Sequence, residues 1–105
     1  MSHAPAVAAE HVVRADPKHC KVEFENDKVR VLRISYGPNE KSIMHSHAPG
    51  AVISLSDQQV RFRFPNGTSE EKHMTTGQAG WVDATTHLPE NLRSEPLELI
   101  YVEVK

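Results

Sequence analysis

The chain has 105 residues, with 12 basic and 14 acidic side chains and a formal net charge of -2 when histidine is neutral. This length suffices for one compact domain but not for two, and the balanced charge, without a basic stripe, argues against nucleic acid as a partner. No run reaches the roughly 18 apolar residues of a membrane-crossing helix, and the N-terminus lacks the features of a signal peptide, so we expect a cytoplasmic protein without a membrane partner.

Cysteine and histidine are the two residue types whose counts are informative. Cys20 is the single cysteine, which excludes an internal disulfide and fits a reducing compartment. The seven histidines are more than usual for a chain this short. They are the one compositional hint of a functional site.

The first part of the chain is predicted to be a tail followed by short strands. Residues 1–12 are small and apolar without a period, and we expect a flexible tail there that precedes a single domain over 13–105. Residues 21–24 and 28–35 alternate polar and apolar side chains, as strands with one buried face do. Gly, Pro and Asn within 36–40 indicate a loop.

The rest of the chain continues the pattern of short strands and tight turns. The Asn-Gly pair within 65–67 is a strong hairpin signal, and no segment has the period of an amphipathic helix. Many short strands between turns favour an all-β protein, either an antiparallel sandwich or a barrel. The further predicted strands are 51–56, 60–64, 69–76, 80–84 and 97–104.

Two histidines stand two residues apart in the stretch IMHSHAPGAV at 43–52. In a strand, His45 and His47 would point to the same face. Such a pair can bind a metal, or it can lie on the solvent face of an edge strand. A third element favours the metal, because His87 ends a strand pattern and Asn91 follows four residues later.

These residues match two motifs of a known family. The first motif has a glycine, a His-x-His and a turn, found here as Gly37, His45, His47 and the SDQQ turn. The second motif has a glycine, a histidine and an asparagine, found here as Gly77, His87 and Asn91. In these motifs, and from about residue 22 to the C-terminus, the chain resembles the small single-domain cupins (RmlC-like). The resemblance implies their double-stranded β-helix, a jelly-roll barrel.

The chain departs from the family pattern at two places. The metal-binding glutamate of the family should fall at about residue 51, where this chain has Ala51 followed by Val52. The Pro-x-Gly turn of the second motif is replaced by Val82, Asp83 and Ala84, which affects only the geometry of that turn. The first departure removes the usual carboxylate ligand.

The resemblance implies that His45, His47 and His87 converge on one metal ion inside the barrel. Imidazole suits iron, zinc, copper and nickel, whereas magnesium and calcium prefer oxygen ligands. We therefore expect one divalent transition metal per chain, with Fe(II) favoured and Zn, Ni or Mn as alternatives. Three protein ligands leave a coordination position open, as catalytic sites do.

The charge of such a site discriminates among substrates. Three neutral histidines leave +2 on the site, where two histidines and a carboxylate leave +1, so a small anionic chelating substrate is favoured. Cupins with three-histidine iron sites include enzymes that cleave diketones or oxygenate thiols, and by that analogy we predict a mononuclear non-haem Fe(II) dioxygenase acting on a diketone, enolate or thiol. A zinc- or nickel-dependent hydrolase or lyase, and a non-catalytic small-molecule-binding cupin, are the alternatives.

Apolar side chains are predicted to enclose the site and keep water out. Tyr101 is in addition the candidate catalytic residue, because its hydroxyl could donate a hydrogen bond to a bound oxygen. Core packing is the simpler explanation for each aromatic residue. The candidate wall residues are Ile43, Ile53, Phe62, Trp81 and Tyr101.

The charged residues and the other histidines have different predicted roles. Asp83 and Glu103 are candidates for orienting the ligand imidazoles. Arg61 and Arg63 are expected on an outer face, and would anchor a substrate carboxylate only if they pointed inward. Four histidines are expected outside the site: His73 in an exposed charged run, and His3, His11 and His19 in the tail and the segment after it.

Residues 97–104 form a strand that is apolar on both faces. Such a strand is compatible with a buried subunit interface. We therefore predict a homodimer.

Overall fold

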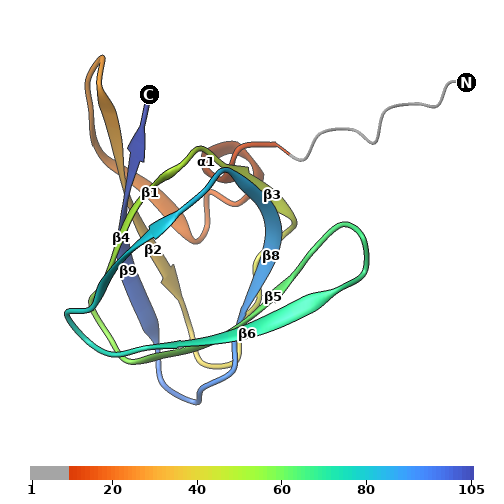
Figure 1. Cartoon of the computed structure of the whole chain (residues 1–105). Helices are drawn as coiled ribbons and strands as arrows, with labels where there is room; N and C mark the ends of the chain where they lie inside the picture. Colours follow the sequence, from red (N-terminus) through yellow and green to blue (C-terminus); the bar gives the residue numbers. More distant parts are fainter. Residues whose placement is uncertain (1–9) are drawn as a thin grey trace, which may run out of the picture.

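The computed structural model describes residues 10–105, which form one short helix and nine strands. The strands pair antiparallel in two sheets that face each other across the interior (Figure 1). The helix of this part of the chain has four residues, too few to cross a membrane. In chain order the elements are α1 (Val12–Ala15), β1 (Cys20–Glu25), β2 (Val29–Tyr36), β3 (His45–His47), β4 (Gly50–Ser54), β5 (Gln58–Arg63), β6 (Ser69–Met74), β7 (Ala79–Val82), β8 (Thr85–Asn91) and β9 (Leu97–Val104).

The chain passes back and forth between the two sheets. One sheet has the order β1-β2-β9-β4-β7, and the other has the order β3-β8-β5-β6. Strands that follow one another in sequence therefore mostly lie in opposite sheets, and the chain winds around the barrel that Figure 1 shows. The predicted all-β architecture is confirmed.

The hydrophobic core lies between the sheets and comes largely from β2 and β9. Leu32 faces Tyr101 and Tyr36 faces Leu97 across this strand pair, and each of the four is at most 4% exposed. The alternation of the two sequences puts these residues on one face. Burying each such side chain stabilises the fold by about 1.5–3 kcal/mol.

The prediction of a tail over residues 1–12 is wrong at its C-terminal end. Residues 1–9 lie outside the described residues, but the carbonyl of Glu10 accepts a hydrogen bond from Ser46 N–H at 2.9 Å. Val12 is fully buried, because it opens the turn of helix that packs against β1 and β3. The segment before β1 therefore reaches the strand that carries His45 and His47.

The Asn-Gly hairpin is confirmed. It joins β5 to β6, and Gly67 has a φ of +88°, a left-handed conformation that glycine adopts without a Cβ clash. The side-chain oxygen of Asn66 accepts a hydrogen bond from Thr68 N–H at 3.0 Å. The hairpin is the projecting loop at the right of Figure 1.

The predicted strand at 80–84 is interrupted in the structure. β7 ends at Val82, and a new strand, β8, begins at Thr85. The break arises because the chain changes sheets here: β7 pairs with β4, whereas β8 pairs with β3 and β5. His87 is therefore the third residue of β8 rather than the end of a strand.

The apolar strand at 97–104 is confirmed as β9, the middle strand of its sheet. Its inner face supplies Leu97 and Tyr101 to the core, while Ile100 and Val102 on the other face are half-buried. The homodimer stays a prediction.

Candidate metal centre

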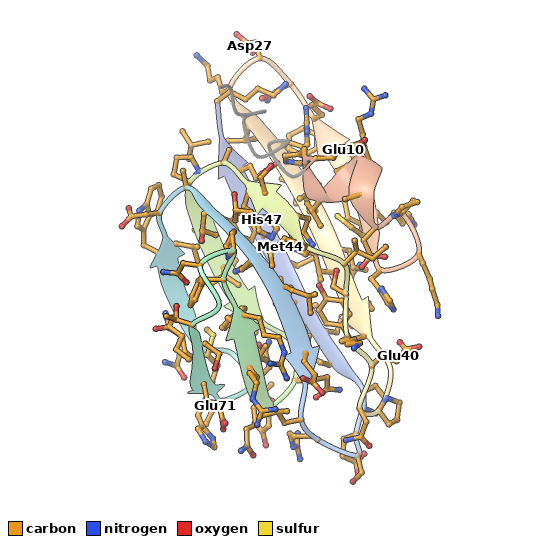
Figure 2. The ribbon with its side chains drawn as sticks, turned by 90° about the vertical axis from the view of Figure 1, so that its right-hand side faces the viewer. Glu10, Asp27, Glu40, Met44, His47 and Glu71 are labelled. Carbon is orange, nitrogen blue, oxygen red and sulfur yellow. The ribbon has the colours of Figure 1, made fainter. Side chains whose placement is uncertain are left out.

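Three histidines meet on the inner face of the four-stranded sheet. His45 and His47 are alternate residues of β3, so both point inward, and His87 lies directly opposite His45 in the antiparallel register of β3 and β8. One ring nitrogen from each lies within 4.8 Å of the other two. Figure 2 shows His47 between the two ends of the barrel, away from Asp27 and Glu71. The predicted convergence of the three side chains is confirmed.

Burial keeps the three imidazoles neutral near neutral pH. His45, His47 and His87 are 0%, 6% and 8% exposed. Because an imidazolium is poorly solvated there, burial lowers the pKa of His45 to about 4 and that of His87 to about 3. Burial, helped by repulsion from the neighbouring histidines, lowers the pKa of His47 to about 2. Neutral imidazoles carry the lone pair that a metal ligand must offer.

We expect the metal-free protein to lose stability as the pH falls below about 6.5. Unfolded histidines take up protons near their ordinary pKa of 6.5, whereas the folded ones stay neutral to about pH 4 or lower. The stability that these histidines contribute to the folded protein is therefore fully present above pH 6.5, and it is lost as the pH falls towards their pKa values in the folded protein. Each histidine lowers the unfolding free energy by about 1.4 kcal/mol per pH unit in this interval.

Urea denaturation at a series of pH values measures this slope. The His87→Leu variant should have a shallower slope than the wild type, and the His73→Gln variant, which changes an exposed histidine, should match the wild type. A His87→Leu slope equal to that of the wild type would contradict the prediction.

Two aromatic rings pack face to face on the histidines. The ring of Phe62 stacks on His87 with centroids 4.9 Å apart, and the ring of Tyr101 stacks on His47 at 4.6 Å. The Tyr101 hydroxyl donates to the carbonyl of Ala48 at 2.7 Å. Tyr101 thus meets the site through its ring, and its hydroxyl has a backbone acceptor rather than a free direction into the site.

The buried ring nitrogens fit a metal. His47 Nδ1 and His87 Nε2 are buried and have no hydrogen-bond partner among the described residues. An unpaired buried polar atom costs about 1–3 kcal/mol, so such atoms are rare without a function. The donor set of three neutral imidazoles suits a divalent transition ion, which His87 Nε2 could bind. His47 faces the other histidines through Nε2, 3.0 Å from His45 Nε2.

The groups that contact the histidines from outside differ from the predicted ones. Asp83 accepts a hydrogen bond from Trp81 Nε1, and Glu103, which is buried, contacts His11 and the Ala48 N–H. Neither bonds to a ligand histidine. The hydroxyl of Ser42 lies 3.1 Å from His45 Nδ1 instead, and Asp16 lies 2.5 Å from that hydroxyl.

A cavity of about 550 Å³ adjoins the histidines and is lined mainly by apolar side chains. Phe62 and Tyr101 line it as predicted. Trp81 borders it but is 60% exposed, since it pairs with Ala51 on the outer face of β4. Ile43 and Ile53 are not among its lining residues, and Ile43 is 58% exposed. The cavity wall also includes His47, Val52, Lys72 and His87.

Val52, rather than Ala51, is the residue of β4 that faces the site. Val52 is buried, lines the cavity and pairs with Tyr101, whereas Ala51 lies on the opposite face of the strand. Strand alternation therefore corrects the predicted position by one residue. The aliphatic side chain of Val52 therefore lines the cavity together with His47 and His87, in place of the carboxylate of the cupin motif.

The arginines and Asn91 lie outside the site. Arg61 and Arg63 form ion pairs with Glu90 on the outer face, as predicted. Asn91 is buried, and its amide donates to the carbonyls of Gly37 and Glu95, so it holds two loops together.

The remaining histidines divide into exposed and paired ones. His73 is exposed, as predicted, and His3 lies outside the described residues. His11 and His19 are not part of the group of three, and each is paired with a carboxylate. His11 Nε2 contacts Glu103 at 2.6 Å, and His19 Nδ1 contacts Asp16 at 2.7 Å.

Comparison with known proteins gives the fold. No protein-family model and no curated protein matches the chain. A cupin domain from Bordetella pertussis Tohama I is 19% identical, with a TM-score of 0.75 over 82% of this chain and 91% of that one. An RmlC-like cupin family protein with a double-stranded β-helix fold, from Methanocaldococcus jannaschii, is 14% identical, with a TM-score of 0.63 over 99% of this chain and 88% of that one.

A larger enzyme also contains the same fold. Bacillus subtilis oxalate decarboxylase, which has Mn(II) centres, is 19% identical, with a TM-score of 0.56 over 72% of this chain and 21% of the enzyme. Together with the sheet order and the inward-facing histidines, these likenesses establish that the chain has the cupin fold, a double-stranded β-helix.

Proposed function

We propose that the protein binds one divalent transition-metal ion through His45, His47 and His87 and is a mononuclear non-haem Fe(II) dioxygenase. Its substrate would be a small chelating anion, such as a diketone enolate or a thiol. The observation that carries the proposal is the convergence of three buried, neutral imidazoles beside an apolar cavity, with Val52 in place of the carboxylate of the cupin motif.

The ligand set supports a catalytic ion. Three protein ligands leave positions open for other molecules, whereas structural sites are usually closed by four. Fe(II) held there would supply redox chemistry with dioxygen. The Mn(II) centres of the oxalate decarboxylase keep manganese among the ions to test.

Charge supports an anionic substrate. Three neutral histidines leave the full +2 of a divalent ion uncompensated, and Lys72 on the cavity wall lies close enough to His87 to help lower its pKa. The apolar wall limits the water that could screen this charge, so a bound anion is attracted more strongly than in bulk solvent. Phe62 and Tyr101, stacked on the histidines, form a part of the wall that is in contact with them.

We expect the Val52→Glu variant to bind anions more weakly than the wild type does. A carboxylate beside the ligands lowers the net charge of the loaded site from +2 to +1, which should weaken azide binding at least about tenfold. Titration of the Co(II)-loaded protein with azide, followed by visible absorption, measures the affinity. Val52→Gln is the matched control, since it has nearly the same shape without the charge. Equal azide affinity in the Glu and Gln variants would contradict the role of charge.

The catalytic proposal is tested by oxygen uptake. Protein purified without a histidine tag is analysed for metal, loaded anaerobically with Fe(II), and screened with diketones and small thiols in an oxygen electrode. We expect near-stoichiometric iron and oxygen uptake that depends on one of these substrates. Zinc or nickel as the resident ion, with no uptake, would favour a hydrolase or lyase instead. Ligand binding without turnover under any metal would favour a binding protein.

A further inference from the structure

A line of buried polar contacts leads from the segment before β1 to the metal centre. Asp16 Oδ2 lies 2.5 Å from the Ser42 hydroxyl, and that hydroxyl lies 3.1 Å from His45 Nδ1. Asp16, Ser42 and His45 are 3%, 6% and 0% exposed. Two of the three residues lie in loops, and only His45 is one of the predicted ligands.

The chemistry of these groups sets the direction of each hydrogen bond. A carboxylate accepts and has no proton to give, so Ser42 donates its single proton to Asp16. The Tyr36 hydroxyl also contacts Ser42 and can donate to it, and the Ile43 carbonyl at 3.2 Å is, like the carboxylate, only an acceptor. Whichever of these takes the proton, the Ser42 oxygen is left as an acceptor. His45 Nδ1 must therefore be the donor, and its Nε2 keeps a free lone pair.

That lone pair points at the site. His45 Nε2 lies 3.0 Å from His47 Nε2, inside the group of three histidines. Because His45 Nε2 is bare, His47 Nε2 is the donor in this contact, so the proton of His47 is fixed only through His45. His47 Nδ1 and His87 Nε2 have no partner in the described part of the chain. His45 is therefore the histidine whose proton is held by residues outside the group of three.

Asp16 is itself held in place. His19 contacts Asp16 Oδ2 through Nδ1 at 2.7 Å and Glu40 Oε1 through Nε2 at 3.1 Å. The same Glu40 oxygen accepts a hydrogen bond from Gly37 N–H at 2.6 Å. In Figure 2, Glu40 marks the loop where this chain of contacts reaches the surface. The carboxylate therefore cannot turn away from Ser42 without also breaking its contact with His19.

We propose that Asp16 is a positioning residue for the metal centre: through the Ser42 hydroxyl it holds His45 in the tautomer with a proton on Nδ1 and a lone pair on Nε2. The inference rests on the proposed metal site for its purpose, but its first consequence concerns the metal-free protein. An imidazole with the proton on Nε2 would have to exchange tautomers before it could bind a metal through that atom. Groups that orient metal-binding histidines in this way are typically worth about 10- to 100-fold in metal affinity.

Nitrogen NMR of the metal-free protein tests the tautomer directly. With ¹⁵N-labelled histidine, the two ring nitrogens of His45 give separate shifts that show which one carries the proton. We expect Nδ1–H in the wild type. Ser42→Ala removes the hydroxyl acceptor and leaves His45 only the weaker contact with the Ile43 backbone. Asp16→Asn introduces an amide that can donate to Ser42 and turn its proton towards His45. Both variants should shift the population towards Nε2–H.

Zinc affinity gives the second measurement. In competition with a chromophoric chelator, we expect Ser42→Ala and Asp16→Asn to bind Zn²⁺ about 10- to 100-fold more weakly than the wild type. Ser42→Thr keeps the hydroxyl and should restore both the tautomer and the affinity. Asp83→Asn is the control for loss of a carboxylate near the cavity, and should change neither. Amide NMR spectra establish that each variant is folded.

The outcomes separate the two proposals. A wild-type His45 that carries its proton on Nε2, or a tautomer unchanged in both Ser42→Ala and Asp16→Asn, would overturn the role of Asp16. An Nδ1–H wild type whose tautomer changes in the variants, but which binds no metal, would support that role and contradict the proposed metal site.

Discussion

The His45→Ala/His47→Ala double variant should purify with less than about a tenth of the metal bound by the wild type. It loses two of the three ligand side chains, and a single remaining imidazole holds a divalent ion only weakly. Metal content is measured by mass spectrometry on protein produced without a histidine tag. His73→Ala is the control, because this histidine is exposed on β6 and should leave the content unchanged.

Two results would count against the metal site. One is equal metal content in the wild type and the double variant. The other is a wild type that binds no metal even after incubation with iron, zinc, nickel and manganese. Either would leave a barrel whose three histidines pack as neutral core residues.

Gly50→Ala should destabilise the fold by about 3 kcal/mol or more, or prevent folding altogether. A Cβ atom at Gly50 would lie 2.2 Å from the carbonyl oxygen of Val102 and 2.7 Å from Cε1 of Tyr101. Backbone oxygen cannot move aside as a flexible side chain can, so β4 and β9 would have to separate. Because Tyr101 stacks on His47, the shift should also reach the metal centre.

Thermal and urea unfolding measure the effect, with Gly80→Ala as the matched control. A Cβ atom at Gly80 would meet only Val52 Cγ1 at 3.8 Å, an ordinary contact, so this variant should change the stability by less than about 0.5 kcal/mol. Similar unfolding midpoints for the two alanine variants would show that the close approach at Gly50 relaxes easily.

Sequence patterns were sufficient for most of the strands, though not for β8, and for the pairing of His45 with His47. Alternation identified β2 and β5, and the two-residue spacing of His45 and His47 placed both on one face. The addition of His87 came from the resemblance to cupins. Its position opposite His45 depends on strand register, which a single sequence does not specify.

The errors have physical causes. Trp81 and Val82 are both apolar, so alternation could not tell which of them faces the interior. Ala51 and Val52 are also both apolar, and for the same reason the sequence did not show which of them faces the site. Asp16 and Ser42 were missed because polar loop residues have no period, and they meet across 26 positions of sequence. The pair His11 and Glu103 spans 92 positions. Such contacts exist only once the barrel has closed.

The placement of the ligands on a single sheet has a consequence for how the protein could evolve. His45, His47 and His87 come from the neighbouring strands β3 and β8, whereas Val52 and Tyr101 belong to the opposite sheet. Hydrogen-bond register fixes the spacing of the ligands, and the facing sheet supplies much of the wall that a substrate would touch. Substitutions in that wall could therefore alter which molecules fit without moving the three histidines, so that the proposed metal centre could be retained while specificity diverges.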